Sequence, residues 1–456
     1  TMIDFSLTEE QQQLRDLARE FAKNEIRPVT AEHDKTGEFP LGVLRKAWEL
    51  GLMNTHIPEA YGGLGLGTLE GCIMGEETAW GCTGISTAVE ANTLAQAPII
   101  VAGSEEQKKK YIPGLASGKL KGCYCLTEPS SGSDANSGKS KAVLSEDGKH
   151  YILNGQKMWI TNGGFADLLV VFAKIDDDES LSAFILERDY EGITMNPEEK
   201  KMGIKGSSTR QVFFNDVKVP VENLLSERQN GFKIAVNILN IGRIKLGGVV
   251  LGSAKDGVSY ATNYANEREQ FGRPISKYGA IRHKLGEMAI QTYALESAVY
   301  RATQNIEDAI KDLEDGGMNH ADATLKGISS FAPECAMMKV LGSEVVDYIA
   351  DEAVQILGGM GYSAETRAER SYRDARINRI FEGTNEINRM LTVDMILKKA
   401  MKGEIDLMTP AMEVAMKLWV FQISTHLLTT FLNAILTISE NSRKLFLWLL
   451  VLQLKN

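Results

Sequence analysis

Two carboxylates in the stretch RIFEGTNEINRM, residues 379–390, are candidates for acid–base chemistry. Glu382 and Glu386 are four positions apart, which is about one helical turn, and Gly383 follows the first of them. A glutamate in the turn before a helix can enter a cleft, where a carboxylate can act as a general base. Both glutamates could instead be first-turn charges that favour the helix dipole. The spacing alone leaves both interpretations open.

Two glycine-rich stretches fit neither of the common nucleotide motifs. In GSDANSGKS, five residues separate Gly132 from Gly138, whereas a nucleoside-triphosphate loop has four residues between its glycines. The stretch GGLGLG lacks the G-x-G-x-x-G spacing and follows no predicted strand. An NTPase and a nicotinamide-binding Rossmann unit are therefore not expected.

Three other stretches could approach a phosphate or a planar ring. CYCLTEPSSGSD places Thr127 on a predicted strand and Ser133 in the following turn, where backbone amides could meet a pyrophosphate. Trp159 and Thr161 in KMWITNGG could flank a flat ring, although Trp159 could equally be a core aromatic residue. In QILGGMGYSAETRAERSYRD, residues 355–374, paired glycines allow a close approach or simply end a helix.

Charge and cysteine content exclude several classes of function. The formal net charge is -10 over 456 residues, which argues against nucleic-acid binding because phosphate backbones require surplus Lys and Arg. The five cysteines predict no disulfide framework. Cys123 and Cys125 lie on a predicted strand, where we expect their side chains on opposite faces, so no metal site is predicted. No secretory signal pattern is visible, and a cytoplasmic location is expected.

Apolar periodicity divides the chain into four segments. A capping box at Thr8 and Gln11 opens a helical region. Apolar alternation then predicts strands, with an Asn-Gly pair at 154–155 that predicts a β-hairpin, before long helical patterns return. The expected fold class is α+β. Its predicted parts are an N-terminal α-helical domain (1–120), a central antiparallel β domain (121–225), a C-terminal antiparallel helical bundle (226–400) and a short apolar tail (401–456).

The tail differs from the rest of the chain in composition. Residues 418–439 contain no Asp, Glu, Lys or Arg, and a second apolar run covers 445–454. A membrane span needs about 20 apolar residues, but polar side chains interrupt the first run. Peripheral membrane contact, a packed helical hairpin and an artefactual end are the three interpretations.

Taken together, these stretches resemble the flavin-dependent acyl-CoA dehydrogenases. CLTEPSSGSDANS, residues 125–137, and residues 355–374 fit the two signature stretches of that family at every defined position. EKKMGIKGSSTRQVFFNDVKVP and RIFEGTNEI are most similar to the very-long-chain branch. The resemblance implies an FAD-dependent enzyme of fatty acid β-oxidation that converts acyl-CoA to trans-2-enoyl-CoA. It also implies that electrons pass to an electron-transferring flavoprotein.

The resemblance assigns roles residue by residue. Flavin-ring contacts would come from Tyr124, Leu126 and Thr127, with Trp159 and Thr161 near N5 and Ser133 at the pyrophosphate. A second set would reach the FAD of a neighbouring subunit, which implies a homodimer or homotetramer. That set consists of Arg268, Gln270, Phe271, Gln355 and Gly359. Thr384 and Glu386 would lie near the phosphate and adenine end of FAD, and substrate contacts would come from Ser133, Arg243, Glu90 and Gly383.

In the same resemblance, Glu382 matches the catalytic base, and its backbone amide would donate to the thioester oxygen. Some relatives carry the base on an earlier helix, at the position of Gly242. Glu90 matches the floor of a medium-chain pocket, where very-long-chain enzymes have glycine, so medium to long acyl chains are expected. An acyl-CoA oxidase that uses oxygen and a non-catalytic assembly scaffold are the alternatives.

Overall fold

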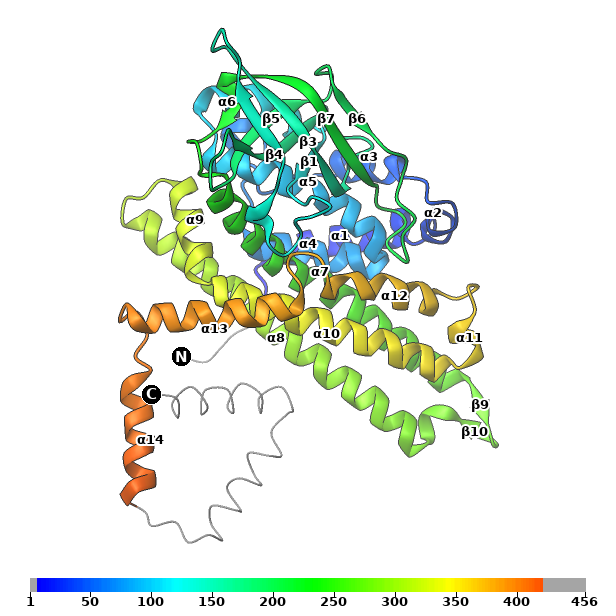
Figure 1. The fold of residues 1–456 in the computed structure, drawn as a ribbon. Helices are drawn as coiled ribbons and strands as arrows, with labels where there is room; N and C mark the ends of the chain where they lie inside the picture. The colour runs from blue at the N-terminus through cyan, green and yellow to red at the C-terminus, as the bar shows by residue number, and fades with distance from the viewer. Residues whose placement is uncertain (1–5, 421–456) are drawn as a thin grey trace. The chain divides into compact units, whose positions relative to one another are not determined.

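The structure is a computed structural model that describes residues 6–420 (Figure 1). Its contacts separate Thr1–Val393 from Asp394–Asn456, and the two units are described independently. Most of the apolar tail on which membrane contact was predicted lies outside the described residues. The α+β class is confirmed, because helices come before and after a central, mostly antiparallel sheet. The domain boundaries stay predictions.

The N-terminal region of the first unit is helical. The predicted capping box at Thr8 is present, because its hydroxyl accepts from Gln11 N and its own N–H donates to the Gln11 side chain. Apolar side chains from this region share a core cluster with the sheet and with the start of the long helix that follows it. The helices are α1 (Glu9–Phe21), α2 (Thr30–Thr36), α3 (Leu41–Glu49), α4 (Thr68–Gly81), α5 (Thr83–Ala102) and α6 (Glu105–Ala116).

The central sheet has eight strands in the order β6-β7-β3-β2-β4-β5-β8, with β1 paired to β4. Pairings β1–β4 and β2–β4 are parallel and the others are antiparallel, so the predicted antiparallel domain is mixed. The strands are β1 (Gly122–Cys125), β2 (Lys141–Leu144), β3 (His150–Thr161), β4 (Leu168–Ile175), β5 (Ser182–Glu187), β6 (Ile193–Met195), β7 (Thr209–Pro220) and β8 (Leu224–Leu225).

The hairpin predicted at Asn154 and Gly155 is wrong, because β3 runs straight through both residues. A Cβ on Gly155 would lie 2.3 Å from Ser140 Oγ, so the glycine allows the close approach of the residue that precedes β2. Asn154 Nδ2 donates to Asp216 Oδ1 at 2.9 Å on β7. Asn-Gly is therefore used here for a bulge in the ladder and not for a turn.

The expected placement of Cys123 and Cys125 is also wrong. Residues two apart on a strand point to the same face, and the two sulfur atoms lie 3.6 Å apart in the core. Both thiols are free. No cluster of three or more metal-ligating side chains occurs among residues 6–420, so the pair has no further ligands there.

Long helices form a bundle after the sheet, as predicted. Gly247 packs against Met338 and Gly257 against Ile349, so α7 and α10 run in the same direction. Helix α8 runs in the opposite direction, because Val299 near its middle packs against Gly247, while Lys284 near its start forms an ion pair with Glu352 near the end of α10. The elements are α7 (Gly231–Glu267), the hairpin β9 (Glu269–Gln270) and β10 (Arg273–Pro274), α8 (Gly279–Asp315), α9 (His320–Ser330), α10 (Ala332–Leu357), α11 (Gly359–Tyr362) and α12 (Arg367–Ala375).

Two further helices follow, α13 (Asn385–Met401), which begins in the first unit, and α14 (Met408–Val420) in the second. Among the described residues, α7 alone is long and apolar enough to cross a membrane. Its most apolar window is 67% buried, as expected of a helix in the core of the bundle.

Candidate active site

The predicted base lies in a turn between α12 and α13. Glu382 has φ 59° and Gly383 has φ 81°, left-handed conformations that are strained for a residue with a side chain. The Glu382 atom Oε2 is buried and has no hydrogen-bond partner in the described part of the chain. Burial raises the pKa of Glu382, while the positive charges of Arg243 and Lys339 oppose that rise. A buried carboxyl with an unpaired oxygen and a raised pKa has the properties of a general base.

Gly242 on α7 makes room for this carboxyl group. A Cβ at position 242 would lie 2.7 Å from Glu382 Oε2 and 3.0 Å from Glu382 Cδ. Positions 242 and 382, far apart in the sequence, therefore meet at the same point. The earlier-helix position at which some relatives carry their base faces the same space as the base predicted here.

The second carboxylate, Glu386, has a different environment. It is exposed in the first turn of α13, and hydrogen bonds from its own backbone N–H and from Thr384 lower its pKa. Glu386 thus behaves as a first-turn charge that stabilises the helix N-terminus. The two carboxylates therefore have different environments, and the role of Glu382 as the base stays a prediction.

Arg243 is buried next to Gly242. Its Nε donates to the Glu382 carbonyl oxygen at 3.1 Å, and its Nη1 donates to Asn240 Oδ1 at 3.0 Å. Burial lowers the pKa of Arg243, and the charge of Glu382 raises it. The arginine therefore holds the backbone of the base, a contact that the sequence did not predict.

Tyr124 on β1 comes close enough to sense the charge of the base. Its hydroxyl is buried without a hydrogen-bond partner among the described residues. The pKa of Tyr124 is raised first by burial and then by the charge of Glu382. Two buried polar atoms without hydrogen-bond partners among the described residues, the Tyr124 hydroxyl and Glu382 Oε2, thus lie in the same region of the protein.

Two segments predicted to contact a flavin ring are joined by a buried ion pair. Lys157 Nζ lies 2.7 Å from Glu128 Oε1 and donates to Leu126 O at 3.1 Å. Met158 N donates to Thr127 O at 2.9 Å. Lys157 and Glu128 are residues that the sequence analysis missed, although both lie inside the stretches it singled out. The pair fixes the spacing between β1 and β3.

Trp159 and Thr161 follow this ion pair on β3. Trp159 has φ 60° next to an irregular step in the β3–β7 ladder, and 54% of the residue is exposed. The core interpretation of Trp159 is therefore wrong, and its indole is available to a ligand. Thr161 is partly exposed at the strand end. Ser133, in the loop after β1, is exposed, and a Cβ added at its neighbour Gly132 would meet only open space.

We expect Glu128→Ala to leave Lys157 charged and unpaired in the core, which costs about 3–5 kcal/mol of stability. Glu128 also accepts hydrogen bonds from Lys139 N and Ser140 N, so the loop that carries Ser133 should loosen. The expected result is a lower ratio of flavin to protein absorbance after purification. Replacing Glu128 and Lys157 together by methionine should recover stability, and full flavin content in Glu128→Ala would contradict the expectation.

The residues predicted to reach a neighbouring subunit lie together at one end of the bundle. Because α7 and α10 are parallel, their C-terminal ends coincide, and Figure 1 shows α11 and the β9–β10 hairpin at that end. All of the predicted residues are exposed there, with Phe271 96% exposed. They are Arg268, Gln270, Phe271, Gln355 and Gly359. Their contact with a second subunit stays a prediction.

Glu90 of α5 forms an ion pair that the sequence did not predict. Lys245 Nζ on α7 lies 2.5 Å from Glu90 Oε2 and donates to Thr93 Oγ1 at 3.3 Å. On α4, a Cβ at Gly71 would lie 3.5 Å from Lys245 Cε. The pair is thus enclosed by three helices. Lys245 follows Gly242 by three positions on α7, which is about 4.5 Å along the helix axis.

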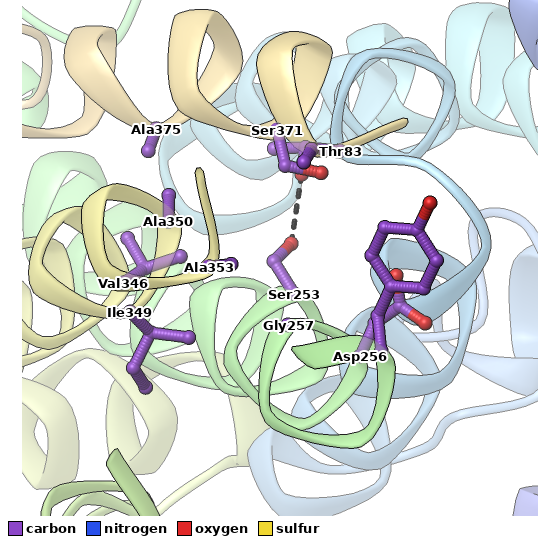
Figure 2. Close-up of a pocket in the computed structure, with 12 residues that line it drawn as sticks. Thr83, Ser253, Asp256, Gly257, Val346, Ile349, Ala350, Ala353, Ser371 and Ala375 are labelled. Atoms are coloured by element: carbon purple, nitrogen blue, oxygen red, sulfur yellow. Dashed lines mark hydrogen bonds between the residues drawn. The ribbon is translucent and has the colours of Figure 1, made fainter. Parts of the chain in front are cut away.

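A cavity elsewhere in the first unit has a different lining. Figure 2 shows it between α7, α10 and α12, beside the start of α5. Thr83 Oγ1 and Ser253 Oγ lie 2.7 Å apart in its lining, to which Ala350 and Ala353 of α10 also belong. None of the residues predicted for catalysis or cofactor binding belongs to its lining.

Three domains of one family account for nearly all of the described chain. Residues 8–119 match the Acyl-CoA dehydrogenase N-terminal domain, residues 123–217 the middle domain and residues 229–397 the C-terminal domain. The chain belongs to the acyl-CoA dehydrogenase family. Members of this family are FAD-dependent oxidoreductases that act on CH–CH groups. The resemblance drawn from the sequence is confirmed.

Individual relatives agree with this assignment. A probable acyl-CoA dehydrogenase of Bacillus subtilis is 46% identical over 406 residues, covering 89% of this chain and 68% of that protein. The very long-chain specific acyl-CoA dehydrogenase of Rattus norvegicus is 41% identical over 369 residues, which are 79% of this chain and 54% of that protein. An acyl-CoA dehydrogenase of Bacillus anthracis complexed with FAD has a TM-score of 0.88 and 45% identity, with 93% of this chain and 72% of that chain covered. This chain spans about half the length of the rat relative.

Proposed function

We propose that this acyl-CoA dehydrogenase removes hydrogen from the α and β carbons of a fatty acyl-CoA thioester and forms the trans-2-enoyl-CoA. The observation that carries the proposal is the Glu382 carboxyl group, buried with Oε2 unpaired beside Gly242. A base that removes a weakly acidic α proton must be held close to that proton. FAD, when bound, supplies the acceptor for the hydride that leaves the β carbon.

The residues present fit a flavin beside this base. The Tyr124 hydroxyl and Glu382 Oε2 are orphaned in one buried region, and orphaned buried polar atoms usually mark a ligand or water. Trp159 offers an exposed ring at the edge of the same sheet. Leu126, Thr127, Ser133 and Thr161 would complete the contacts as the resemblance implies.

The chain itself then performs three tasks. Glu382 takes the α proton, and its raised pKa brings it nearer to the working pH. The Glu382 backbone N–H has no hydrogen-bond acceptor among the described residues and is available to the thioester oxygen, where negative charge develops. Arg243 Nε donates to the Glu382 carbonyl oxygen at 3.1 Å and so helps to position both the carboxyl group and the backbone N–H of Glu382.

Anaerobic mixing with octanoyl-CoA or palmitoyl-CoA tests the proposal. An acyl-CoA dehydrogenase should lose its yellow flavin absorbance within the mixing experiment, and mass spectrometry should find the enoyl-CoA. A scaffold that keeps the fold and the flavin would show no bleaching. Hydrogen peroxide formed at the rate of turnover in air would instead support the oxidase alternative.

We further propose an electron-transferring flavoprotein as the electron acceptor, fatty acid β-oxidation as the pathway, and a homodimer or homotetramer as the assembly. Exposed apolar side chains at the end of the bundle that carries Phe271 support the oligomer, because Met360 and Tyr362 of α11 are exposed there as well, and grouped apolar side chains on a surface mark interaction sites. A peripheral membrane contact through residues 411–456 stays a prediction, and a membrane-bound fraction unchanged by their deletion would contradict it.

For the acyl chain we propose medium to long lengths, with the Glu90–Lys245 pair, about one helical turn from Gly242 along α7, as the floor of the acyl pocket. Because the Glu90 carboxylate is already paired with the Lys245 ammonium, it can stay next to the acyl chain, and the floor of the acyl pocket stays polar. A rate profile that peaks at C4 or above C18 would contradict this range.

Replacing Glu90 and Lys245 together by alanine should open the floor. We expect the ratio of kcat/KM for palmitoyl-CoA to that for octanoyl-CoA to rise by about tenfold, since each added methylene gains apolar contact. Glu90→Ala alone is the control, because it leaves Lys245 unpaired and should chiefly lower stability. An unchanged ratio in a folded, flavin-containing double variant would refute the assigned floor.

A further inference from the structure

A lysine is buried behind the turn that carries Glu382. Lys339 of α10 is fully buried, and its Nζ donates to Gly383 O at 2.6 Å and to Asn385 Oδ1 at 2.8 Å. Among the described residues, no carboxylate lies within ion-pair distance of Lys339. Burying an ammonium without a counter-ion is costly, so its position calls for a physical reason.

The two hydrogen bonds of Lys339 belong to a larger restraint on the strained turn. Arg243 Nε donates to Glu382 O at 3.1 Å, and Asn388 Nδ2 donates to Glu382 O at 3.3 Å and to Gly383 O at 2.7 Å. Side chains of α7, α10 and α13 thus hold the carbonyls of residues 382 and 383. Gly383 adopts positive φ without strain, but positive φ at Glu382, which carries a side chain, persists only under such restraint.

The charges around Lys339 show what else it can do. Glu382 in the turn and Glu386 of α13 face it, together with Arg243 of α7 and Glu344 of its own helix. Burial lowers the pKa of Lys339 to about 8, so the side chain is largely protonated at neutral pH. Its charge in turn opposes the rise in the pKa of Glu382.

We propose that Lys339 is a positioning residue for the base, fixing the left-handed turn at Glu382 and placing a positive charge behind the carboxylate. The inference rests on the proposed function, in which Glu382 must be ionised to take the α proton. Without the charge, the carboxyl group would hold its proton to higher pH. Lys339 itself touches neither substrate nor flavin in this assignment.

Lys339→Met tests the charge with little change in side-chain length. Gly383 O keeps its hydrogen bond from Asn388, and Asn385 Oδ1 keeps the one from Ser343 Oγ at 3.2 Å, so no acceptor is orphaned. In the flavin-loaded enzyme, we expect the acid limb of the kcat/KM profile to move up by about one pH unit. At pH values on the acid side of the parent limb this shift lowers kcat/KM by about tenfold, and on the alkaline plateau it has little effect. Flavin absorbance and the midpoint of thermal unfolding report separately on the fold.

Two further variants separate charge from packing. Lys339→Arg keeps the charge and should leave the acid limb in place, while Lys339→Gln should move it as methionine does. Lys157→Met is the matched control, because Lys157 is also fully buried but is paired with Glu128. It should lower flavin content without moving the acid limb.

The outcomes distinguish the two claims. A parent enzyme that bleaches with acyl-CoA but shares its acid limb with Lys339→Met and Lys339→Gln overturns the role of Lys339 alone. An acid limb that moves equally in Lys339→Arg overturns it as well. If none of the acyl-CoA thioesters bleaches the flavin of the parent enzyme, the proposed function is overturned, and the role of Lys339 with it.

Discussion

Glu382→Gln should lower kcat by at least about a thousandfold while leaving the flavin spectrum unchanged. Glutamine has the size of glutamate but cannot accept the α proton. The turn should survive, because its hydrogen bonds from Arg243 and Asn388 go to the backbone carbonyl of residue 382 and not to the carboxyl group. Steady-state turnover with octanoyl-CoA, at a verified flavin content, measures the effect.

The same variant should not be less stable than its parent at alkaline pH. The pKa of Glu382 in the folded protein is raised by burial, so the native state binds this proton more tightly than the unfolded chain does. The stability gained from this proton is present below the unfolded pKa and is lost as pH rises through the folded pKa. Glutamine never becomes charged, so thermal unfolding at pH 8 should show Glu382→Gln at or above the parent. A large loss of stability there would mean that the carboxylate has a structural partner.

Gly242→Ala is expected to lower activity while leaving the helix as stable as in the parent, or more stable. The added Cβ would lie 2.7 Å from Glu382 Oε2, so the carboxyl group must move. Displacing a catalytic group by about 1 Å can cost on the order of a hundredfold in rate. The helix itself should gain up to about 1 kcal/mol, because alanine favours a helix interior more than glycine does.

Gly286→Ala on α8 is the matched control for this prediction. A Cβ at Gly286 meets nothing within 4 Å, so the variant should share the helix stabilisation without the loss in rate. Thermal unfolding and kcat are measured on both variants. Equal activity in Gly242→Ala and Gly286→Ala would place the reacting carboxyl group away from α7.

Local signals in the sequence predicted local structure well. The capping box at Thr8 needs only residues of its own turn, and it is present as expected. The Asn-Gly pair was misread because its partners are distant in the sequence: Ser140 precedes β2, and Asp216 lies on β7. Turn chemistry carries no information about such neighbours.

The candidate base was predicted, whereas the groups that hold it were not. Spacing could not decide between Glu382 and Glu386, and it is burial against α7 that distinguishes them. Lys339 precedes Gly383 by 44 positions and meets it only because α10 packs behind the turn. One signal was available, because AMMKVLG, residues 336–342, places a single lysine within an otherwise apolar stretch of helix. A lysine in such a place predicts a buried polar contact without naming its partner.

Exchange of the α protons of an acyl-CoA in deuterium oxide, followed anaerobically by proton NMR, tests the role of Glu382 most directly. The account predicts that the flavin-loaded parent and Glu386→Gln exchange the α protons at similar rates, and that Glu382→Gln leaves them in place. Exchange by Glu382→Gln at the parental rate, or its loss in Glu386→Gln alone, would contradict the account.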